Sequence, residues 1–106
     1  MNIFKRIKYY FMWRKAISMA EDAHYATGLR YYVIPSNDGK LMVIDRGNFR
    51  TLKHKGYIKS TATVHDLLSE CFYHTAYANG SQSMHPEILE IKRKIYWQWA
   101  QRFASK

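Results

Sequence analysis

The strongest constraint on the fold is a predicted helix over residues 3 to 27 that carries two apolar stripes in place of one. Gly28 is a typical helix stop. On a helical wheel the stripes lie nearly opposite each other, so one straight helix on one core cannot bury both. Either the helix bends near Met12, or its first turns face something other than this chain's core. The first stripe is Ile3, Phe4, Ile7, Tyr10 and Phe11, and the second is Trp13, Ala16, Ile17, Ala20, Ala23, His24 and Thr27.

The first stripe leaves three alternatives open. It could close the domain's own core, dock as a helix into a groove on a partner protein, or lie on an anionic membrane surface. We rank the first two equally and the membrane third. Residues 1–12 are therefore a candidate partner-docking segment, with Phe4, Ile7 and Phe11 as candidate interface residues.

A β-hairpin is predicted over about residues 30–46. Two segments rich in β-branched and aromatic residues, 30–34 and 40–46, flank the turn cluster Pro35-Ser-Asn-Asp-Gly. An isolated hairpin is marginal in water, so it must pack on helices or pair with another strand.

Three further helices are predicted after the hairpin. Asn48 suits the N-cap of a short basic helix, Phe49 to Lys55, and Thr63 begins a helix that runs to about Ala78. A polar loop over 79–83 separates it from a last helix, Pro86 to about Phe103. The expected class is α+β, mostly helical, with one hairpin and three to four helices in a single domain, 1–106.

Basic residues indicate an anionic partner. The chain has 17 Lys and Arg against 8 Asp and Glu, a net charge of +9, and no acid among its first twenty residues. Basic runs can contact phosphates, although a single run is usually a solvated helix face. The candidate anion- or nucleic-acid-binding residues are Arg46, Arg50, Lys53, Lys55, Lys59, Lys92, Arg93 and Lys94.

The last helix adds Trp97 to the candidate interface. Ile88, Ile91, Ile95 and Trp99 form its expected inward face, which Leu89, Tyr96, Ala100 and Phe103 widen. Trp97 falls among charged residues on the other side. A tryptophan there can anchor a protein interface or stack on bases, and packing under a neighbouring segment is an equally good interpretation.

Catalytic and metal chemistry find little support in the residue pattern. Cys71 and His74 are three apart on one predicted helix, and His65 lies about two turns from His74, but a buried thiol beside surface histidines is the better interpretation. The sequence lacks a G-x-S-x-G, an H-E-x-x-H and a P-loop. We expect no enzyme activity, no cofactor and no bound metal.

No stretch is long and apolar enough for a membrane span, and the N-terminus lacks the features of a signal peptide. A single cysteine cannot form an intrachain disulfide, which fits a reducing compartment. We expect a protein that is not secreted by a signal peptide.

Residues 30–58, Arg30-Tyr-Tyr-Val-Ile through Lys-Gly-Tyr-Ile58, resemble segments of short uncharacterised proteins of tailed bacteriophages and of mobile elements in gut bacteria. The resemblance implies a location in the virion or in the cytoplasm of a bacterial host. It implies a structural subunit, such as a capsid auxiliary protein, and carries no catalytic residues.

Two functions are expected from these observations. The first is a non-enzymatic structural or accessory subunit that binds a larger protein assembly or a second copy of itself. The second is a small nucleic-acid-binding protein without sequence specificity.

Overall fold

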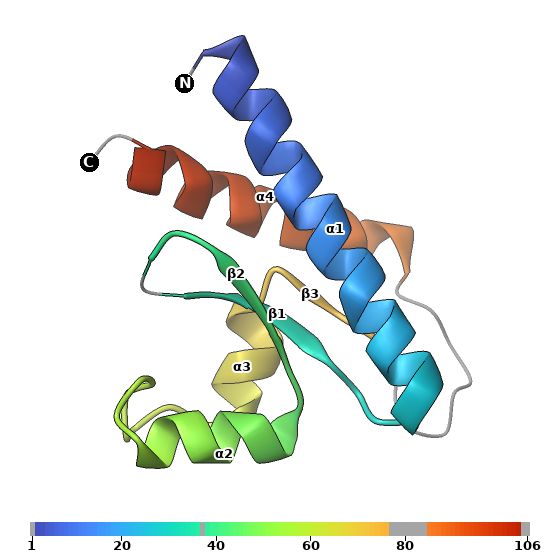
Figure 1. Ribbon diagram of the computed structural model, residues 1–106, viewed down its shortest axis with the longest axis vertical. Coiled ribbons are helices and arrows are strands. Elements are labelled where there is room, and N and C mark those ends of the chain that lie inside the picture. Colours follow the sequence, from blue (N-terminus) through green and yellow to red (C-terminus); the bar gives the residue numbers. More distant parts are fainter. Residues whose placement is uncertain (1, 37, 77–84, 105–106) are drawn as a thin grey trace.

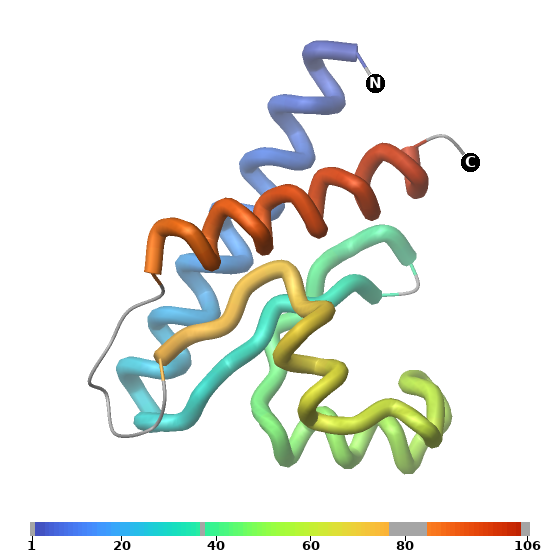
Figure 2. The backbone as a smooth tube through the Cα atoms, turned by 180° about the vertical axis from the view of Figure 1, so that it is seen from behind, coloured from blue at the N-terminus to red at the C-terminus, as the bar shows by residue number. Residues whose placement is uncertain are grey.

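The computed structural model describes residues 2–36, 38–76 and 85–104, and there the chain forms four helices around a three-stranded antiparallel sheet (Figures 1 and 2). The predicted α+β, mostly helical class is confirmed. Residue 37 of the predicted turn and the predicted loop 79–83 lie outside the described residues. The helices are α1 (Ile3–Thr27), α2 (Arg46–His54), α3 (Val64–Glu70) and α4 (Pro86–Ala104), and the strands are β1 (Tyr32–Pro35), β2 (Leu41–Ile44) and β3 (Tyr73–His74).

Helix α1 is continuous and runs without a kink in Figures 1 and 2, so the alternative of a bend near Met12 is wrong. Asn2 caps its start by accepting a hydrogen bond from the Lys5 amide at 2.9 Å. Gly28 ends it in the left-handed region, with φ at 76°. At about 1.5 Å per residue, its 25 residues nearly span the 40 Å long axis of the molecule. The buried residues are Tyr9, Trp13, Ala16, Ile17 and Ala20.

The sheet has the order β2-β1-β3, which confirms the predicted hairpin and adds a strand to it. Val33 pairs with Val43 on one side and with Tyr73 on the other. The Phe72 amide donates to the Val33 carbonyl at 2.8 Å, extending this pairing beyond the strand itself. Strand β1 is therefore the central strand.

The prediction that the third helix runs to about Ala78 is wrong, because α3 ends at Glu70. Residues 72–75 are Phe, Tyr, His and Thr, which favour extended structure over helix. Pairing them with β1 also satisfies backbone groups that would otherwise be exposed along its edge. The predicted start at Thr63 is confirmed, since Thr63 and Asp66 form a reciprocal capping box.

Two apolar clusters lie on opposite sides of β1, following the alternation of its side chains. Val33 joins the cluster built mainly from α1 and α4, while Tyr32 and Ile34 join the one with α2 and α3. In Figures 1 and 2, α4 crosses α1, and α2 and α3 lie at the opposite end of the molecule.

Trp13 is the centre of the first cluster. It is 2% exposed, its indole donates a hydrogen bond to the Phe72 carbonyl at 3.0 Å, and its ring stacks on Tyr96. The Tyr96 hydroxyl donates to the Tyr9 carbonyl. Burial raises the pKa of Tyr96 well above its usual range. These contacts fasten α4 and the β3 segment to the middle of α1.

Helix α2 begins earlier than predicted. Asp45, and not Asn48, is its N-cap, accepting from the Asn48 amide at 2.7 Å. An aspartate cap also places a negative charge at the helix N-terminus, where the dipole favours it.

The predicted inward face of α4 is confirmed for Tyr96 and Ala100 and is wrong for Ile88 and Ile91. Ile88 and Ile91 are 41% and 56% exposed, while Lys92, Tyr96 and Ala100 are buried. The buried face follows the position of α1 and α3 around α4, which hydrophobicity along one helix does not encode.

Candidate functional site

The first stripe of α1 is open to solvent in this chain. We call Ile3, Phe4, Ile7, Tyr10 and Phe11 the α1 apolar face; their exposed fractions run from 43% at Tyr10 to 78% at Phe4. Residues 2–8 are all exposed, and the first turns of α1 project past the sheet in both views (Figures 1 and 2). The interpretation that this stripe closes the domain's own core is therefore wrong.

The α1 apolar face forms one wall of a groove whose other wall is Trp97 of α4. The groove has a volume of about 310 Å³. Trp97 is half-buried, and its ring lies 5.7 Å from that of Tyr96. The structure thus brings Ile7, Phe11 and Trp97 together from two helices, while Phe4 lies on the same helix face outside the groove lining. Lining residues are Ile3, Arg6, Ile7, Tyr10, Phe11 and Trp97.

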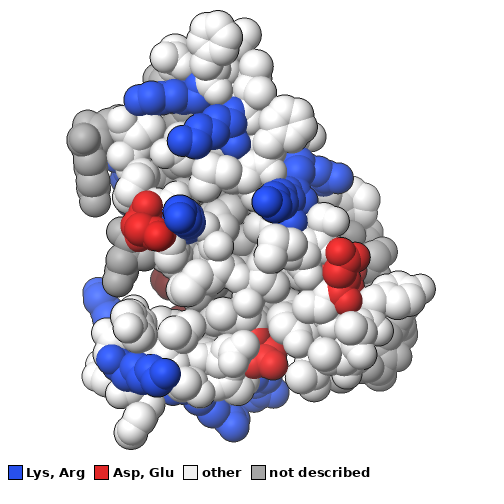
Figure 3. Space-filling view, in the orientation of Figure 1, with Lys and Arg blue, Asp and Glu red and all other residues white. Residues whose placement is uncertain are grey.

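Cations surround this groove. At 100° per residue, Lys8 and Lys15 flank one side of the α1 apolar face and Arg6 flanks the other. Arg14 follows the α1 apolar face along the helix, about one turn after Tyr10. Arg6 also lines a neighbouring hollow with Arg93, Trp97 and Gln101. In Figure 3, lysine and arginine gather over the N-terminal half of α1. An apolar centre with a basic rim is the result.

The basic residues of α2 form a second candidate surface. Arg46, Arg50 and His54 are spaced four apart on the helix and are all exposed. Lys55 and Lys59 follow and are exposed as well. Figure 3 shows basic side chains at this end of the molecule, separated from those over α1 by acidic ones.

Two of the candidate anion-binding lysines are engaged inside the protein. Lys92 is 4% exposed, and its ammonium donates to the Leu68 and Ser69 carbonyls at 2.6 and 3.1 Å. It caps the C-terminal end of α3, where a cation is favourable, so its prediction as a surface anion ligand is wrong. Lys53 is half-buried and donates to the Ala62 carbonyl at 2.6 Å.

The remaining two basic candidates on α4 differ from each other. Arg93 pairs with Glu90 through two hydrogen bonds of 2.6 and 3.0 Å. This pair lowers the pKa of the Glu90 carboxyl and raises the pKa of the Arg93 guanidinium. Lys94 is exposed. The run Lys92–Lys94 is therefore divided between the interior, an ion pair and solvent.

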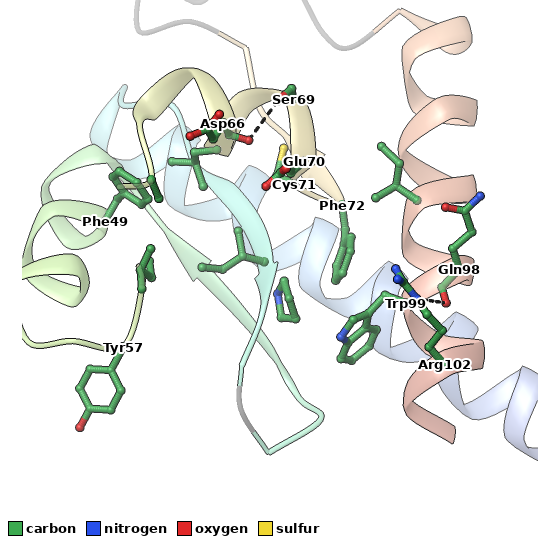
Figure 4. A pocket seen from close by; sticks show the side chains of 16 residues that line it. Phe49, Tyr57, Asp66, Ser69, Glu70, Cys71, Phe72, Gln98, Trp99 and Arg102 are labelled. Atoms are coloured by element: carbon green, nitrogen blue, oxygen red, sulfur yellow. Dashed lines mark hydrogen bonds between the residues drawn. The ribbon is translucent and has the colours of Figure 1, made fainter. Parts of the chain in front are cut away.

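A larger cavity of about 530 Å³ lies between the α2–α3 end and α4 (Figure 4). Phe72 and Trp99 form its wall on the α4 side and Phe49 lies opposite, while Tyr57 points away. Arg102 reaches it from α4, but its Nε donates to the Gln98 carbonyl of the same helix at 3.3 Å. The acidic lining residues Asp66 and Glu70 belong to α3, and the Asp66 carboxylate is engaged in the capping box with Thr63.

Cys71 lines this cavity but is 1% exposed, and burial raises the pKa of its thiol. A raised pKa lowers the thiolate fraction and hence its nucleophilicity. Because α3 ends before it, Cys71 does not share a helix face with His74, contrary to the prediction. His74 belongs to β3, and burial lowers the pKa of its imidazole.

Metal ligands do not gather in the part of the chain that the structure describes: no three His, Cys, Asp or Glu side chains there are placed to hold an ion. Across those same residues, no helix has the length and hydropathy that crossing a bilayer requires.

Neither the groove nor the burial of Lys92 could be predicted from the sequence, because both depend on how the helices pack. A signal for β3 was present in the aromatic and threonine content of residues 72–75. No comparable signal marked Lys92, which is one of three adjacent basic residues. Comparisons of this chain with protein-family models, with curated proteins and with solved structures found no match.

Proposed function

We propose that this protein is a non-enzymatic accessory subunit that docks onto a larger protein assembly through the α1 apolar face and Trp97. A phage particle is the setting that the resemblance of residues 30–58 suggests. The observation that carries the proposal is a row of five large apolar side chains left open along the end of a helix whose opposite side is packed.

The α1 apolar face leaves apolar surface in contact with water, and burying that surface against a partner would be favourable. Burying apolar area stabilises by about 25 cal/mol per Å², so exposed Phe4, Phe11 and Ile3 represent a contribution that only a partner can realise. Scattered exposed apolar residues are ordinary on proteins, whereas a contiguous patch marks an interaction site. Trp97 beside this patch adds a residue type enriched in binding hot spots.

Photo-crosslinking tests the proposal with a control on the same helix. Phe4 or Phe11 is replaced by p-benzoylphenylalanine, and the full chain is expressed in its source cells and irradiated. Tyr25 serves as the control position because it is 92% exposed and lies on the same side of α1, about four turns from Phe11 and about six from Phe4. We expect one discrete adduct from Phe4 and Phe11, and none from Tyr25.

The same experiment can reject the proposal. Adducts of equal yield from Tyr25 would show that α1 contacts neighbours without preference for this face. An isolated chain that native mass spectrometry finds to be a stable monomer, together with no adduct from either phenylalanine, would leave the docking function without support.

Nucleic-acid binding is the second candidate, favoured by the exposed row Arg46, Arg50 and His54 on α2 with Lys55 and Lys59 beside it. Lys94 is exposed as well, while Lys92, Lys53 and Arg93 have partners within the protein. This surface offers charges that can contact phosphates, and such contacts position a nucleic acid without reading its sequence.

Binding of a single-stranded oligonucleotide at two salt concentrations tests this candidate. Four or five phosphate contacts predict a fall in affinity of roughly 50- to 130-fold between about 0.05 and 0.2 M salt. Arg46→Gln with Arg50→Gln should reduce both the affinity and its salt dependence. No binding at the lower salt concentration would remove the candidate.

A further inference from the structure

We infer that the groove between α1 and Trp97 receives an amphipathic helix with acidic flanks, supplied by another protein. The inference rests on the proposed docking function and adds the chemistry of the partner. It follows from three features of the described residues: the concave shape of the site, its basic rim and the composition of its two walls.

The shape of the site suits a side chain from a partner helix. Two crossing helices supply the walls, with Ile7 and Phe11 from α1 facing Trp97 from α4. A volume of about 310 Å³ accommodates one large apolar side chain, and the α1 apolar face continues past it to Phe4. Helix-in-groove recognition uses such anchors, spaced three and four residues apart on the incoming helix.

The charge around the site selects an acidic partner. Lys8 and Lys15 lie along one side of the α1 apolar face and Arg6 along the other, and no acid occurs in residues 1–20 to offset them. A helix with apolar anchors flanked by Glu or Asp would place its carboxylates opposite both rows. Such rim charges contribute mainly to specificity and to the association rate.

A second copy of this chain is the less suitable occupant. A symmetric dimer through the α1 apolar face would bring together two copies of its flanking cations, Arg6 and Lys8. Like charges placed opposite each other oppose such an interface.

An anionic bilayer is also a less suitable occupant. A membrane surface favours a protruding apolar face, whereas here half-buried Trp97 forms the far wall of a hollow. Glu90 and Arg93 lie on α4 about two turns and one turn before Trp97, and their ion pair would have to approach the headgroups.

Two synthetic peptides of about five helical turns serve as probes, measured by fluorescence anisotropy with the full chain. Both carry Leu at the helical spacing i, i+3, i+4 and i+7; one has Glu at the flanking positions and the other has Lys. We expect the Glu-flanked peptide to bind at least about tenfold more tightly at about 50 mM NaCl. The preference should shrink at about 500 mM, where screening is stronger.

Two double variants separate the apolar from the electrostatic contribution. Phe4→Ser with Phe11→Ser should abolish binding of both peptides, and circular dichroism should remain unchanged because both positions are exposed. Lys8→Glu with Lys15→Glu should reverse the preference toward the Lys-flanked peptide. Lys55→Glu with Lys59→Glu, away from the groove, changes the net charge equally and should leave the preference intact.

The outcomes distinguish this inference from the docking function. Equal binding of both peptides that is lost in the Phe4/Phe11 variant overturns the acidic partner and leaves docking intact. Peptide binding that is equally tight in the Phe4/Phe11 variant and in the wild type overturns both the acidic partner and the docking function.

Failure of both peptides to bind also overturns the inference. In that case two further measurements identify the alternative occupant. Sedimentation with vesicles of phosphatidylcholine and phosphatidylglycerol would indicate a membrane, and a concentration-dependent dimer abolished by the Phe4/Phe11 variant would indicate a second copy.

Discussion

Lys92 shows how one residue's role depends on what lies opposite it. Its side chain is buried, and its ammonium is held by carbonyls at the end of α3. Burying an ammonium is costly, but hydrogen bonds and the negative end of a helix offset much of that cost. The residue joins α4 to α3 across the edge of the sheet.

Replacing Lys92 with Met should lower the free energy of unfolding by about 1 to 3 kcal/mol, because the Leu68 and Ser69 carbonyls lose their donor while the side-chain volume is kept. Urea denaturation measures the change. Lys94→Met, at an exposed neighbour, is the matched control and should change stability little. Equal stability of Lys92→Met and the wild type would show that the ammonium contributes nothing net.

Gly39 is the residue where the hairpin meets α4. Its φ of 81° is unfavourable for other residues, and a Cβ there would lie 2.3 Å from the Phe103 ring. The Phe103 ring in turn stacks on Trp99, so it is not free to move without cost. Glycine here satisfies both the turn and the close approach of α4.

Gly39→Ala should destabilise the protein more than Gly56→Ala. Gly56 has a similar φ of 86° but no atom within contact distance, so its substitution reports backbone strain alone, about 1 to 2 kcal/mol. The difference in thermal midpoint between the two variants measures the Phe103 contact. Identical midpoints would mean that the ring relaxes without loss.

At the scale of elements, α1 has two faces with opposite tasks. One face contributes Trp13, Ala16 and Ala20 to the core, and the other presents the α1 apolar face to solvent. Its capped ends and continuous hydrogen bonding hold the exposed turns in line with the buried ones.

Alanine substitutions on the two faces should separate stability from binding. Trp13→Ala should cost about 3 to 5 kcal/mol, since it removes a buried ring and the hydrogen bond to Phe72. Phe11→Ala should change stability by less than about 0.5 kcal/mol because the side chain is 64% exposed. Chemical denaturation of both variants checks this, and a large loss at Phe11 would mean that its ring supports the fold.

At the scale of the whole molecule, the net charge is already +9, so protons bound at acidic pH add to the repulsion within the folded state and lower its stability. His74 adds a specific contribution where β3 meets the interior. Burial lowers the pKa of its imidazole, and the nearby charges of Arg30 and Lys92 act in the same direction. The folded state therefore favours the neutral ring.

Stability should fall as the pH drops below about 6.5, the ordinary value for histidine, because the unfolded chain then binds a proton that the folded chain resists. The urea midpoint at about pH 7.5 and about pH 5.5 measures the slope. His74→Gln keeps the other four histidines and should flatten it. An unchanged slope in this variant would assign the effect to other groups.

Local patterns in the sequence determined much of this protein. Apolar periodicity and caps predicted α1 and α4 closely, turn residues predicted the hairpin, and Thr63 with Asp66 predicted the start of α3. The two apolar stripes on opposite sides of α1 already implied that, if the helix is straight, only one of them can pack against the core of the domain. These features depend on neighbours within a turn or two of the chain, which a sequence records directly.

Only the tertiary structure decided which surfaces meet. Strand β3 exists because β1 offers it an edge, Lys92 is buried because α3 ends beside it, and Trp97 joins the α1 apolar face because α4 crosses α1 there. Each of these arises from contacts between residues more than twenty positions apart. Residue order alone does not specify such contacts, because their free energy depends on how whole elements pack.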